Sequence, residues 1–179
     1  MITSLFPARF RFSGHALALL TAATFALTAC NQAEKPVTPL EITGDTTCSL
    51  DGMLLADYPG PKAQIHYDQG QPDFFCDTVE MFSIYLRPEQ QKRIKAVFVQ
   101  DMGKADWKTP KGHWIDARTA FYVKGSRLNG GMGPTMASFA LESDAKDFAA
   151  HNGGTVLPFA AVTPDMVTLD GGILHDQRM

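Results

Sequence analysis

The amino-terminal segment constrains this chain most, because it removes residues 1–29 from the part that can fold. Arg9 and Arg11 give the segment a positive start, an apolar run follows over residues 16–26, and small residues precede Cys30. This order is typical of an export signal, and the apolar run is shorter than the ~20 residues that a membrane-spanning helix needs. Removal of these 29 of the 179 residues leaves 150, enough for one globular domain or two small ones.

The end of the signal, residues 27–30 (LTAC), resembles the cleavage site of a bacterial lipoprotein, in which the cysteine receives lipid chains. We therefore predict a lipoprotein signal peptide over residues 1–29 and lipidation at Cys30. More than one acyl chain would hold the protein on a membrane, because each buried methylene contributes about 0.8 kcal/mol. By the same resemblance, Asn31 after the cysteine favours the outer membrane, with the protein in the periplasm. The alternative is an ordinary signal peptide that leaves Cys30 free.

Composition and charge exclude several classes of protein. The chain is 45% hydrophobic and 20% charged, which is typical of globular proteins and not of disordered or coiled-coil ones. Loss of the signal removes two arginines and no acidic residue, so the formal charge changes from −3 to −5 and no nucleic-acid partner is expected. Three cysteines are too few for a disulfide scaffold. Residues 30–45 contain two prolines and no helical or strand period, which predicts a lipidated tether.

The first half of the remaining chain, residues 46–106, has the signals of two strands, a helix and a third strand. The first two strands are predicted at residues 63–67 (AQIHY) and 73–76. Residues 77–78 (DT) can cap the amino terminus of a helix. Residues 94–100 (IKAVFVQ) are rich in β-branched side chains and predict a buried strand.

The second half, residues 107–162, repeats this order of signals. They are strand material at residues 114–123, 137–141 and 156–159, a turn-rich stretch at residues 125–133, and a helix capped by Ser143. The faint similarity of the halves predicts an α+β protein of two small subdomains. Residues 163–179 are expected to form a carboxy-terminal tail.

Two sulfur-bearing residues occur in sequence contexts that favour metal binding. Cys48 lies in a polar segment just after the tether, and Met132 lies between glycines in residues 129–134 (NGGMGP). A methionine between glycines has no neighbouring side chain to pack against, which suits an accessible thioether on a loop. Thiolate and thioether are soft donors that select Cu(I) among biological metals. The sequence has no CxxC or HxxxH pair, so zinc is not indicated.

Further donors are less clearly placed. His66 is expected to point out of its strand and His113 stands beside a tryptophan, so both are compatible with a third ligand. Met136 has no assigned face. Cys76 follows two phenylalanines and is expected to be a small apolar residue at a strand end. In an oxidising compartment, the alternative is a binding module with a Cys48–Cys76 disulfide.

Longer stretches resemble the NosL family of lipoproteins, which act as copper chaperones for the assembly of nitrous oxide reductase. The resemblance extends from Cys48 to about Phe159, and its opening stretch is long enough to be specific. The matching stretches are residues 48–53 (CSLDGM), 56–65 (ADYPGPKAQI), 75–78 (FCDT), 81–82 (MF), 120–126 (AFYVKGS), 131–133 (GMG) and 153–156 (GGTV).

This resemblance implies a site, a fold and a partner. The family's metal-binding cysteine falls on Cys48 and its Gly-Met-Gly methionine on Met132, so one Cu(I) would be bound between the two halves. The family fold resembles two ββαβ units related to organomercurial lyase. The copper would be delivered toward the copper–sulfide centre of nitrous oxide reductase or to its maturation machinery. Many members have a cysteine directly before the Gly-Met of the first motif, but Asp51 occupies that position here, which leaves further ligands open.

An enzymatic role is the competing hypothesis. By analogy with the lyase, Cys48 and Cys76 with Asp77 would cleave a carbon–metal bond, the carboxylate handling the proton. The sequence has no serine nucleophile elbow, P-loop or dinucleotide fingerprint. We therefore expect a metal carrier rather than an enzyme.

Overall fold

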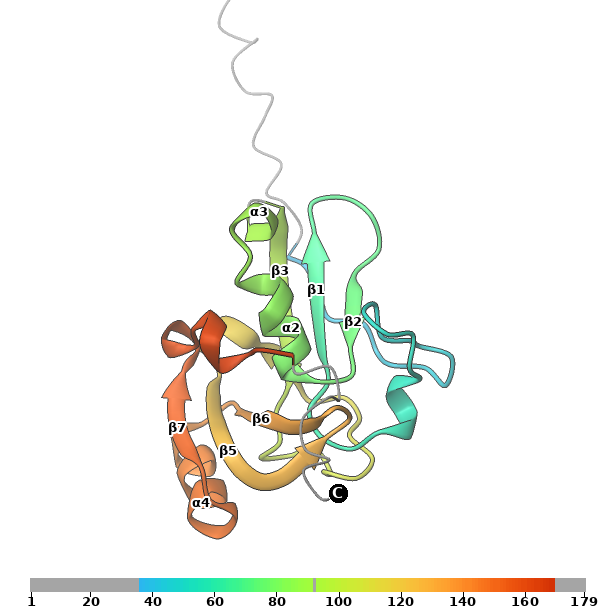
Figure 1. The fold of residues 1–179 in the computed structure, drawn as a ribbon. Helices are drawn as coiled ribbons and strands as arrows, with labels where there is room; N and C mark the ends of the chain where they lie inside the picture. The colour runs from blue at the N-terminus through green and yellow to red at the C-terminus, as the bar shows by residue number, and fades with distance from the viewer. Residues whose placement is uncertain (1–35, 92, 170–179) are drawn as a thin grey trace, which may run out of the picture. The chain divides into compact units, whose positions relative to one another are not determined.

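Two antiparallel sheets form the fold in the computed structural model, which describes residues 36–91 and 93–169 (Figure 1). The predicted signal peptide and Cys30 lie outside the described residues. The elements are η2 (Leu55–Asp57), β1 (Ala63–Tyr67), β2 (Asp73–Phe75), α2 (Thr78–Tyr85), α3 (Pro88–Gln91), β3 (Ile94–Gln100), β4 (Trp114–Asp116), η3 (Ala117–Thr119), β5 (Phe121–Gly130), β6 (Gly133–Phe139), α4 (Glu142–Asn152), β7 (Thr155–Pro158), η4 (Phe159–Ala161) and η5 (Pro164–Met166).

The first sheet has the strand order β2-β1-β3-β4, with every neighbouring pair antiparallel. β1 and β3 have the bounds that the sequence predicted. The Asp77 side chain accepts a 2.8 Å hydrogen bond from the Val79 N–H and so caps α2, as expected. Met81 and Phe82 on α2 are fully buried with the inward side chains of the sheet. Burial of this apolar face therefore fixes α2 against the sheet.

The second sheet has the order β6-β5-β7, again antiparallel, and α4 contacts all three of its strands. Its order of elements, β5β6α4β7, matches β1β2α2β3 of the first sheet. The predicted α+β fold with a repeated ββαβ order is thus confirmed.

The second half differs in detail from the prediction. The predicted turn-rich stretch instead belongs largely to β5, which pairs with β6 with an irregularity between Lys124 and Asn129. The glycines there favour turns, but Gly125, with a φ of 79°, lies in the irregular part of β5, and Gly130 pairs with Gly133 of β6. The Ser143 cap was also wrong, because Leu141 precedes α4 without a side-chain cap.

The boundary between the halves also differs from the prediction at residue 106. β4 pairs with β3 and extends the first sheet. The short helix η3 then separates β4 from β5, so the stretch predicted as one strand contributes to both sheets. The connection between the two halves therefore runs from β4 of the first sheet through η3 to β5 of the second sheet.

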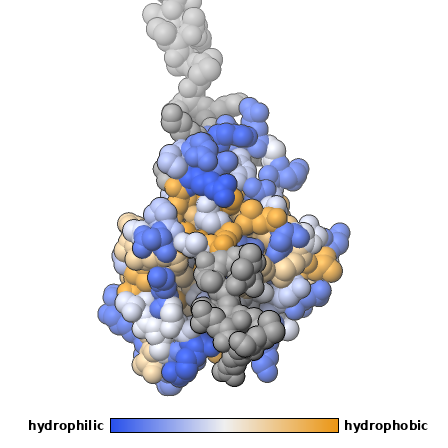
Figure 2. Space-filling model, in the orientation of Figure 1, coloured by the Kyte–Doolittle hydropathy of each residue, from blue (hydrophilic) through white to orange (hydrophobic). Residues whose placement is uncertain are grey.

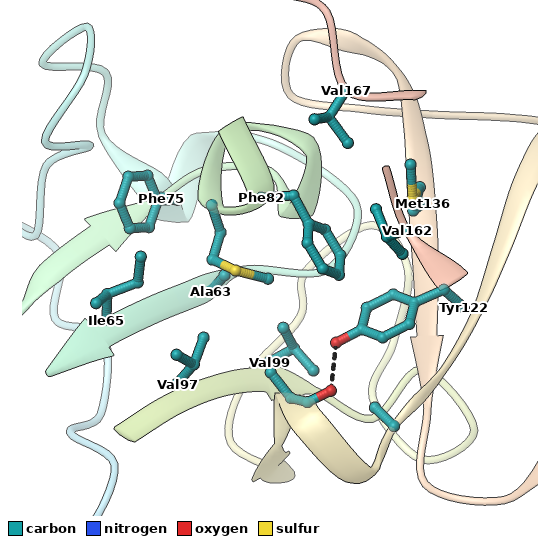
Figure 3. Close-up of a cluster of buried hydrophobic side chains, with 13 residues drawn as sticks. Ala63, Ile65, Phe75, Phe82, Val97, Val99, Tyr122, Met136, Val162 and Val167 are labelled. Carbon is teal, nitrogen blue, oxygen red and sulfur yellow. Dashed lines mark hydrogen bonds between the residues drawn. The ribbon is translucent and has the colours of Figure 1, made fainter. Parts of the chain in front are cut away.

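One hydrophobic core is built from both halves (Figure 3). Phe82 of α2 packs edge-on against Tyr122 of β5, with ring centroids 4.9 Å apart. The Tyr122 hydroxyl donates a 2.8 Å hydrogen bond to the Ala117 carbonyl, which satisfies its polar atom inside the core. The described residues from Val37 onward accordingly form one compact unit.

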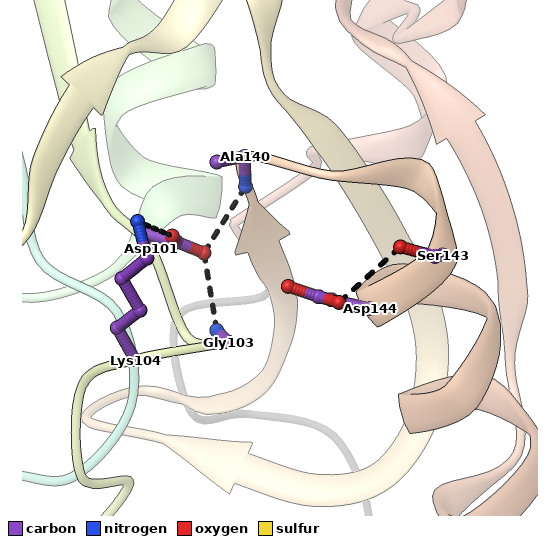
Figure 4. A network of polar contacts seen from close by, with 6 residues as sticks. All are labelled: Asp101, Gly103, Lys104, Ala140, Ser143 and Asp144. Carbon is purple, nitrogen blue, oxygen red and sulfur yellow. Dashed lines mark hydrogen bonds and ion pairs between the residues drawn. The ribbon is translucent and has the colours of Figure 1, made fainter.

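Polar contacts at β6 also join the halves. The Met102 N–H donates to the Ser138 carbonyl at 2.8 Å. Buried Asp101 accepts 3.1 Å hydrogen bonds from the backbone N–H groups of Gly103 and Ala140, and lies 3.6 Å from the Lys104 ammonium (Figure 4). A single carboxylate thereby ties the segment after β3 to the end of β6.

Both predicted flanking segments contribute to the fold. Within the predicted tether, Leu40 exchanges two 2.9 Å hydrogen bonds with the Gln64 side chain. Ile42 packs against a small buried cluster of Cys48, Leu55 and Cys76. Within the predicted tail, Val167 is 4% exposed and belongs to the main core. The tether and tail predictions are therefore wrong for these residues. In the described part of the chain, no helix is long and apolar enough to cross a membrane.

Candidate metal centre

Cys48 is held by a short loop that folds back on itself. Thr47 and Leu54 form an antiparallel bridge, and the Cys48 N–H donates to the Met53 carbonyl at 2.8 Å. Gly52 closes the turn with a φ of 76°, a left-handed conformation that glycine adopts without strain. The Leu50 N–H is directed at the Cys48 sulfur, 3.4 Å away.

Cys76 approaches the same place from the amino end of α2. It follows β2 directly and precedes the capping residue Asp77. The Ser49 N–H donates a 2.8 Å hydrogen bond to the Phe74 carbonyl, which fastens the Cys48 loop beside β2. Sheet edge and loop together bring the two cysteines into contact range.

Glu80 joins the two cysteines. The thiols of Cys48 and Cys76 both donate to its Oε2 atom, at 3.4 and 3.3 Å. Cys48, Cys76 and Glu80 are 3%, 0% and 2% exposed, respectively. One ligand atom from each of these three and from exposed Asp51 lies within 4.8 Å of the others, a spacing that permits all four to reach one metal ion. Both cysteines are free thiols in the structure, so the disulfide alternative is not formed there.

The environment makes the two thiols unequal. The hydrogen bond between the cysteines, with backbone N–H groups around the Cys48 sulfur, lowers the pKa of Cys48. The same bond and burial raise the pKa of Cys76. Burial also raises the pKa of Glu80. Cys48 is therefore the thiol that loses its proton first and offers a thiolate to a soft cation.

A buried ammonium balances this group of acids. Lys62 is 1% exposed, and its Nζ atom donates to the carbonyls of Pro59 at 2.9 Å and of Cys76 at 3.1 Å. Burial lowers its pKa to about 8, while the neighbouring acidic groups oppose that shift. The charge of Lys62 thus offsets negative charge at the centre.

The hairpin that bears Met132 lies against Cys76. A Cβ atom placed on Gly131 would lie 3.2 Å from the Cys76 sulfur and 3.2 Å from the Tyr58 Cβ atom, so a side chain at this position would require its neighbours to shift. Met132 itself is 49% exposed. The structure thus brings the hairpin of the predicted methionine to the side of the cysteine pair.

Two hydroxyl groups fix the base of this hairpin to α2. Thr135 of β6 donates a 2.7 Å hydrogen bond to Asp77 Oδ1, and Thr78 donates a 2.6 Å hydrogen bond to the Met136 carbonyl. Asp77 is 1% exposed, and burial raises its pKa to about 7. These contacts determine where the Met132 hairpin stands relative to Cys76.

The other predicted donors lie outside the cluster. His66 makes a 2.7 Å hydrogen bond with Gln64 and packs edge-on against Phe98. His113 is exposed, and its carbonyl accepts the Asp101 N–H. Met136 is 1% exposed within the main core.

Sequence reasoning missed three members of the cluster. It assigned Cys76 to packing, gave Glu80 no role, and noted Asp51 only as a departure from the family motif. The signal for Glu80 was its place in the first turn of the helix that Asp77 caps, close in sequence to Cys76. The signal for Asp51 was its position directly before Gly52 and Met53, where many members of the family have a cysteine.

Comparisons with known proteins find relatives of this chain in both sequence and fold. The sequence model of the NosL family matches residues 39–167. The chain is 38% identical over 172 residues to the copper-binding lipoprotein NosL of Stutzerimonas stutzeri, covering 92% of this chain and 89% of that protein. It is 38% identical over 155 residues to the protein of the same name from Achromobacter cycloclastes, covering 83% and 80%.

A solved structure has the same fold. The crystal structure of the copper chaperone NosL from Shewanella denitrificans superposes with a TM-score of 0.71 at 35% identity, covering 73% of this chain and 99% of that one. These names describe copper-binding proteins and not enzymes, in agreement with the expected absence of catalysis. The sequence, the fold and these relatives show that the chain belongs to the NosL family.

Proposed function

We propose that this chain is a periplasmic copper chaperone that carries one Cu(I) at the centre formed by Cys48, Cys76 and Met132. The observation that carries the proposal is the buried pair of free thiols beside the hairpin of an exposed methionine. Soft sulfur ligands select Cu(I) over harder cations. The copper-binding names of the relatives support the same cargo.

Each sulfur has a distinct part in this proposal. Cys48, with its lowered pKa, supplies the thiolate charge that neutralises the cation. Cys76 supplies a second sulfur whose proton is displaced when the metal enters, since thiols ligate metals as thiolates. Met132 supplies a neutral thioether from the solvent side.

The exposed methionine makes the metal transferable. A closed cage of four buried ligands would hold the ion too firmly for a carrier, whereas a half-exposed thioether can be replaced by a ligand of the acceptor. The glycines on either side of Met132 let its hairpin move while the cysteines remain in place.

The anchor and the acceptor complete the proposal. The relatives are named lipoproteins, which supports a lipid anchor for this chain. Lipid chains on Cys30 would tether the protein to a membrane. Asn31 after the cysteine favours the outer membrane. We propose nitrous oxide reductase or its maturation machinery as the destination of the copper.

Competition with bicinchoninate for Cu(I) tests the site. Removing a residue that only hydrogen-bonds to a metal ligand weakens metal binding about 10–100-fold. Cys48→Ser removes a ligand itself, so it should weaken Cu(I) binding by at least about a hundredfold. Met132→Leu, which keeps the side-chain volume, should weaken it about tenfold. Met166→Leu, in η5 away from the cluster, is the matched control and should bind like the parent. The proposal fails if Cys48→Ser and Met132→Leu both bind one Cu(I) as tightly as the parent.

A further inference from the structure

We infer that the surface around the metal centre is a docking face for a copper-accepting protein that presents basic residues around an apolar patch. This inference rests on the proposed chaperone function. We call this surface the rim; it consists of Leu50, Leu54, Met132, Asp45, Asp51 and Asp57.

The apolar part of the rim surrounds the buried thiols. Leu50, Leu54 and Met132 are 42%, 39% and 49% exposed, although side chains of this size are usually buried. Leu50 directs its N–H at the Cys48 sulfur, and Leu54 pairs with Thr47. Met132 follows Gly131, on which a Cβ atom would lie 3.2 Å from the Cys76 sulfur. An exposed apolar group at a functional opening is typical of an interaction site.

Figure 2 shows hydrophobic residues at the side where the segment before β1 lies in Figure 1, and a separate band of them across the middle of the same face. More hydrophilic residues flank the band. A partner that covers the opening would therefore meet apolar and polar groups side by side.

The charged part of the rim has one sign. Asp45, Asp51 and Asp57 are exposed, and no lysine or arginine occurs over residues 37–61. The next basic residue in the chain, Lys62, is buried with its ammonium bonded to backbone carbonyls. The pairing of Thr47 with Leu54 brings the two ends of the loop together, so that negative charge lies on both sides of Cys48.

The negative charge of the rim favours one kind of binding partner over others. A second copy of the chain would place acidic rim against acidic rim, and an anionic membrane surface would also be repelled. A basic protein face is attracted, and steering by opposite charge raises association rates about 10–1000-fold at low salt. An acceptor must also bring its own ligand to the opening beside Met132, so it necessarily contacts the rim.

Rapid mixing of the copper-loaded chain with copper-free nitrous oxide reductase tests the inference. The rate of Cu(I) transfer should fall steeply as salt is added. It should fall about tenfold at low salt in the double variant Asp45→Lys/Asp57→Lys, and also in Leu50→Ser/Leu54→Ser, because rim charges and apolar contacts govern docking. Transfer from the same variants to bicinchoninate, a small chelator that needs no docking face, should be unchanged.

Two substitutions on α4 and its cap serve as matched controls. Asp147→Lys reverses an exposed charge, and Leu141→Ser removes an exposed apolar side chain that is 56% exposed. Both controls should transfer copper at the parent rate.

The inference is overturned if the rim variants transfer copper to the reductase as fast as the controls do, or if the loaded parent transfers none. It is also overturned if charge reversal speeds transfer, or if the rim instead mediates a dimer in sedimentation or binding to anionic vesicles. Loss of Cu(I) binding by the parent itself in the bicinchoninate assay would instead refute the proposed function, so the two failures are distinguishable.

Discussion

At the residue scale, the most unusual feature is the buried ammonium of Lys62, which donates to the Cys76 carbonyl. Its two hydrogen bonds go to backbone carbonyls, and its charge faces Cys48, Cys76, Asp77 and Glu80. Buried charges are costly unless they are paired and hydrogen-bonded. Lys62 therefore connects the stability of this region to the charge of the metal centre.

Replacing this lysine should destabilise the protein more than replacing an exposed one. Lys62→Met leaves two carbonyls without a donor and buried acids without a counter-charge, so the free energy of unfolding should fall by about 3 kcal/mol. Lys146→Met, which breaks the exposed 2.9 Å ion pair with Glu142, should cost under about 0.5 kcal/mol. Urea unfolding of both variants measures the difference, and equal losses would contradict this account.

Asp77 predicts a pH dependence of stability in the copper-free protein. Burial raises its pKa from 3.8 to about 7, so the folded state favours the protonated acid. Its stabilising contribution is fully present below pH 3.8 and is lost as the pH rises through 7. Each pKa unit corresponds to about 1.4 kcal/mol, so the loss is on the order of 4 kcal/mol.

Asp77→Asn tests this dependence, because asparagine can still accept the hydrogen bonds from Val79 and Thr135. Between pH 4 and pH 7, urea unfolding of the parent should show a larger fall in stability than that of the variant. Identical slopes in the two proteins would show that Asp77 does not titrate in this range.

At the scale of the elements, the β5–β6 hairpin and α2 form one assembly through Thr135 and Asp77. The hydroxyl of Thr135 donates a 2.7 Å hydrogen bond to Asp77 Oδ1, and Thr135 is not one of the four residues of the cluster. We expect its effect on copper to act through the position of Met132.

A double-mutant cycle isolates this effect. Thr135→Val should weaken Cu(I) binding several-fold in the parent and have no further effect in the Met132→Leu background, because coupled residues are not additive. The unfolding free energy, measured in parallel, should fall by about 1 kcal/mol in both backgrounds. If the two substitutions instead lowered the copper affinity additively, Thr135 would not act through Met132.

The strands with regular patterns could be predicted from the sequence, as could the cap at Asp77. β1 and β3 alternate or are rich in β-branched residues, so local chemistry determines them. β5 could not be predicted, because its glycines favour turns. Pairing with both β6 and β7 fixes only its first residues, and its end pairs with β6 alone.

Half of the candidate site was also within reach of sequence reasoning. Cys48 and Met132 stand out by composition and by family resemblance. The approach of Cys76 to Cys48 depends on the backbone bond between Ser49 and Phe74, a tertiary contact that no local pattern specifies. The contact of Glu80 with both thiols likewise depends on this tertiary arrangement.

At the scale of the whole molecule, the shared core predicts one cooperative unfolding transition despite the repeated order of elements. Trp114 lies in β4 of the first sheet, and Trp107 stacks on Phe148 of α4 beside the second sheet. The variants Trp107→Phe and Trp114→Phe each leave one reporter. Their fluorescence transitions in urea should coincide with each other and with circular dichroism. Separate midpoints would mean that the halves unfold independently.

The proposed copper site also belongs to the whole molecule, since Cys48, Cys76 and Met132 come from a loop, the residue before the cap of α2 and the β5–β6 hairpin. X-ray absorption at the copper edge of the Cu(I)-loaded protein counts their sulfur atoms directly. We expect a shell of sulfur neighbours that loses one sulfur in Cys48→Ser and one in Met132→Leu. A shell of nitrogen and oxygen only, or a sulfur count that neither substitution changes, would contradict the central claim that these sulfurs hold the ion.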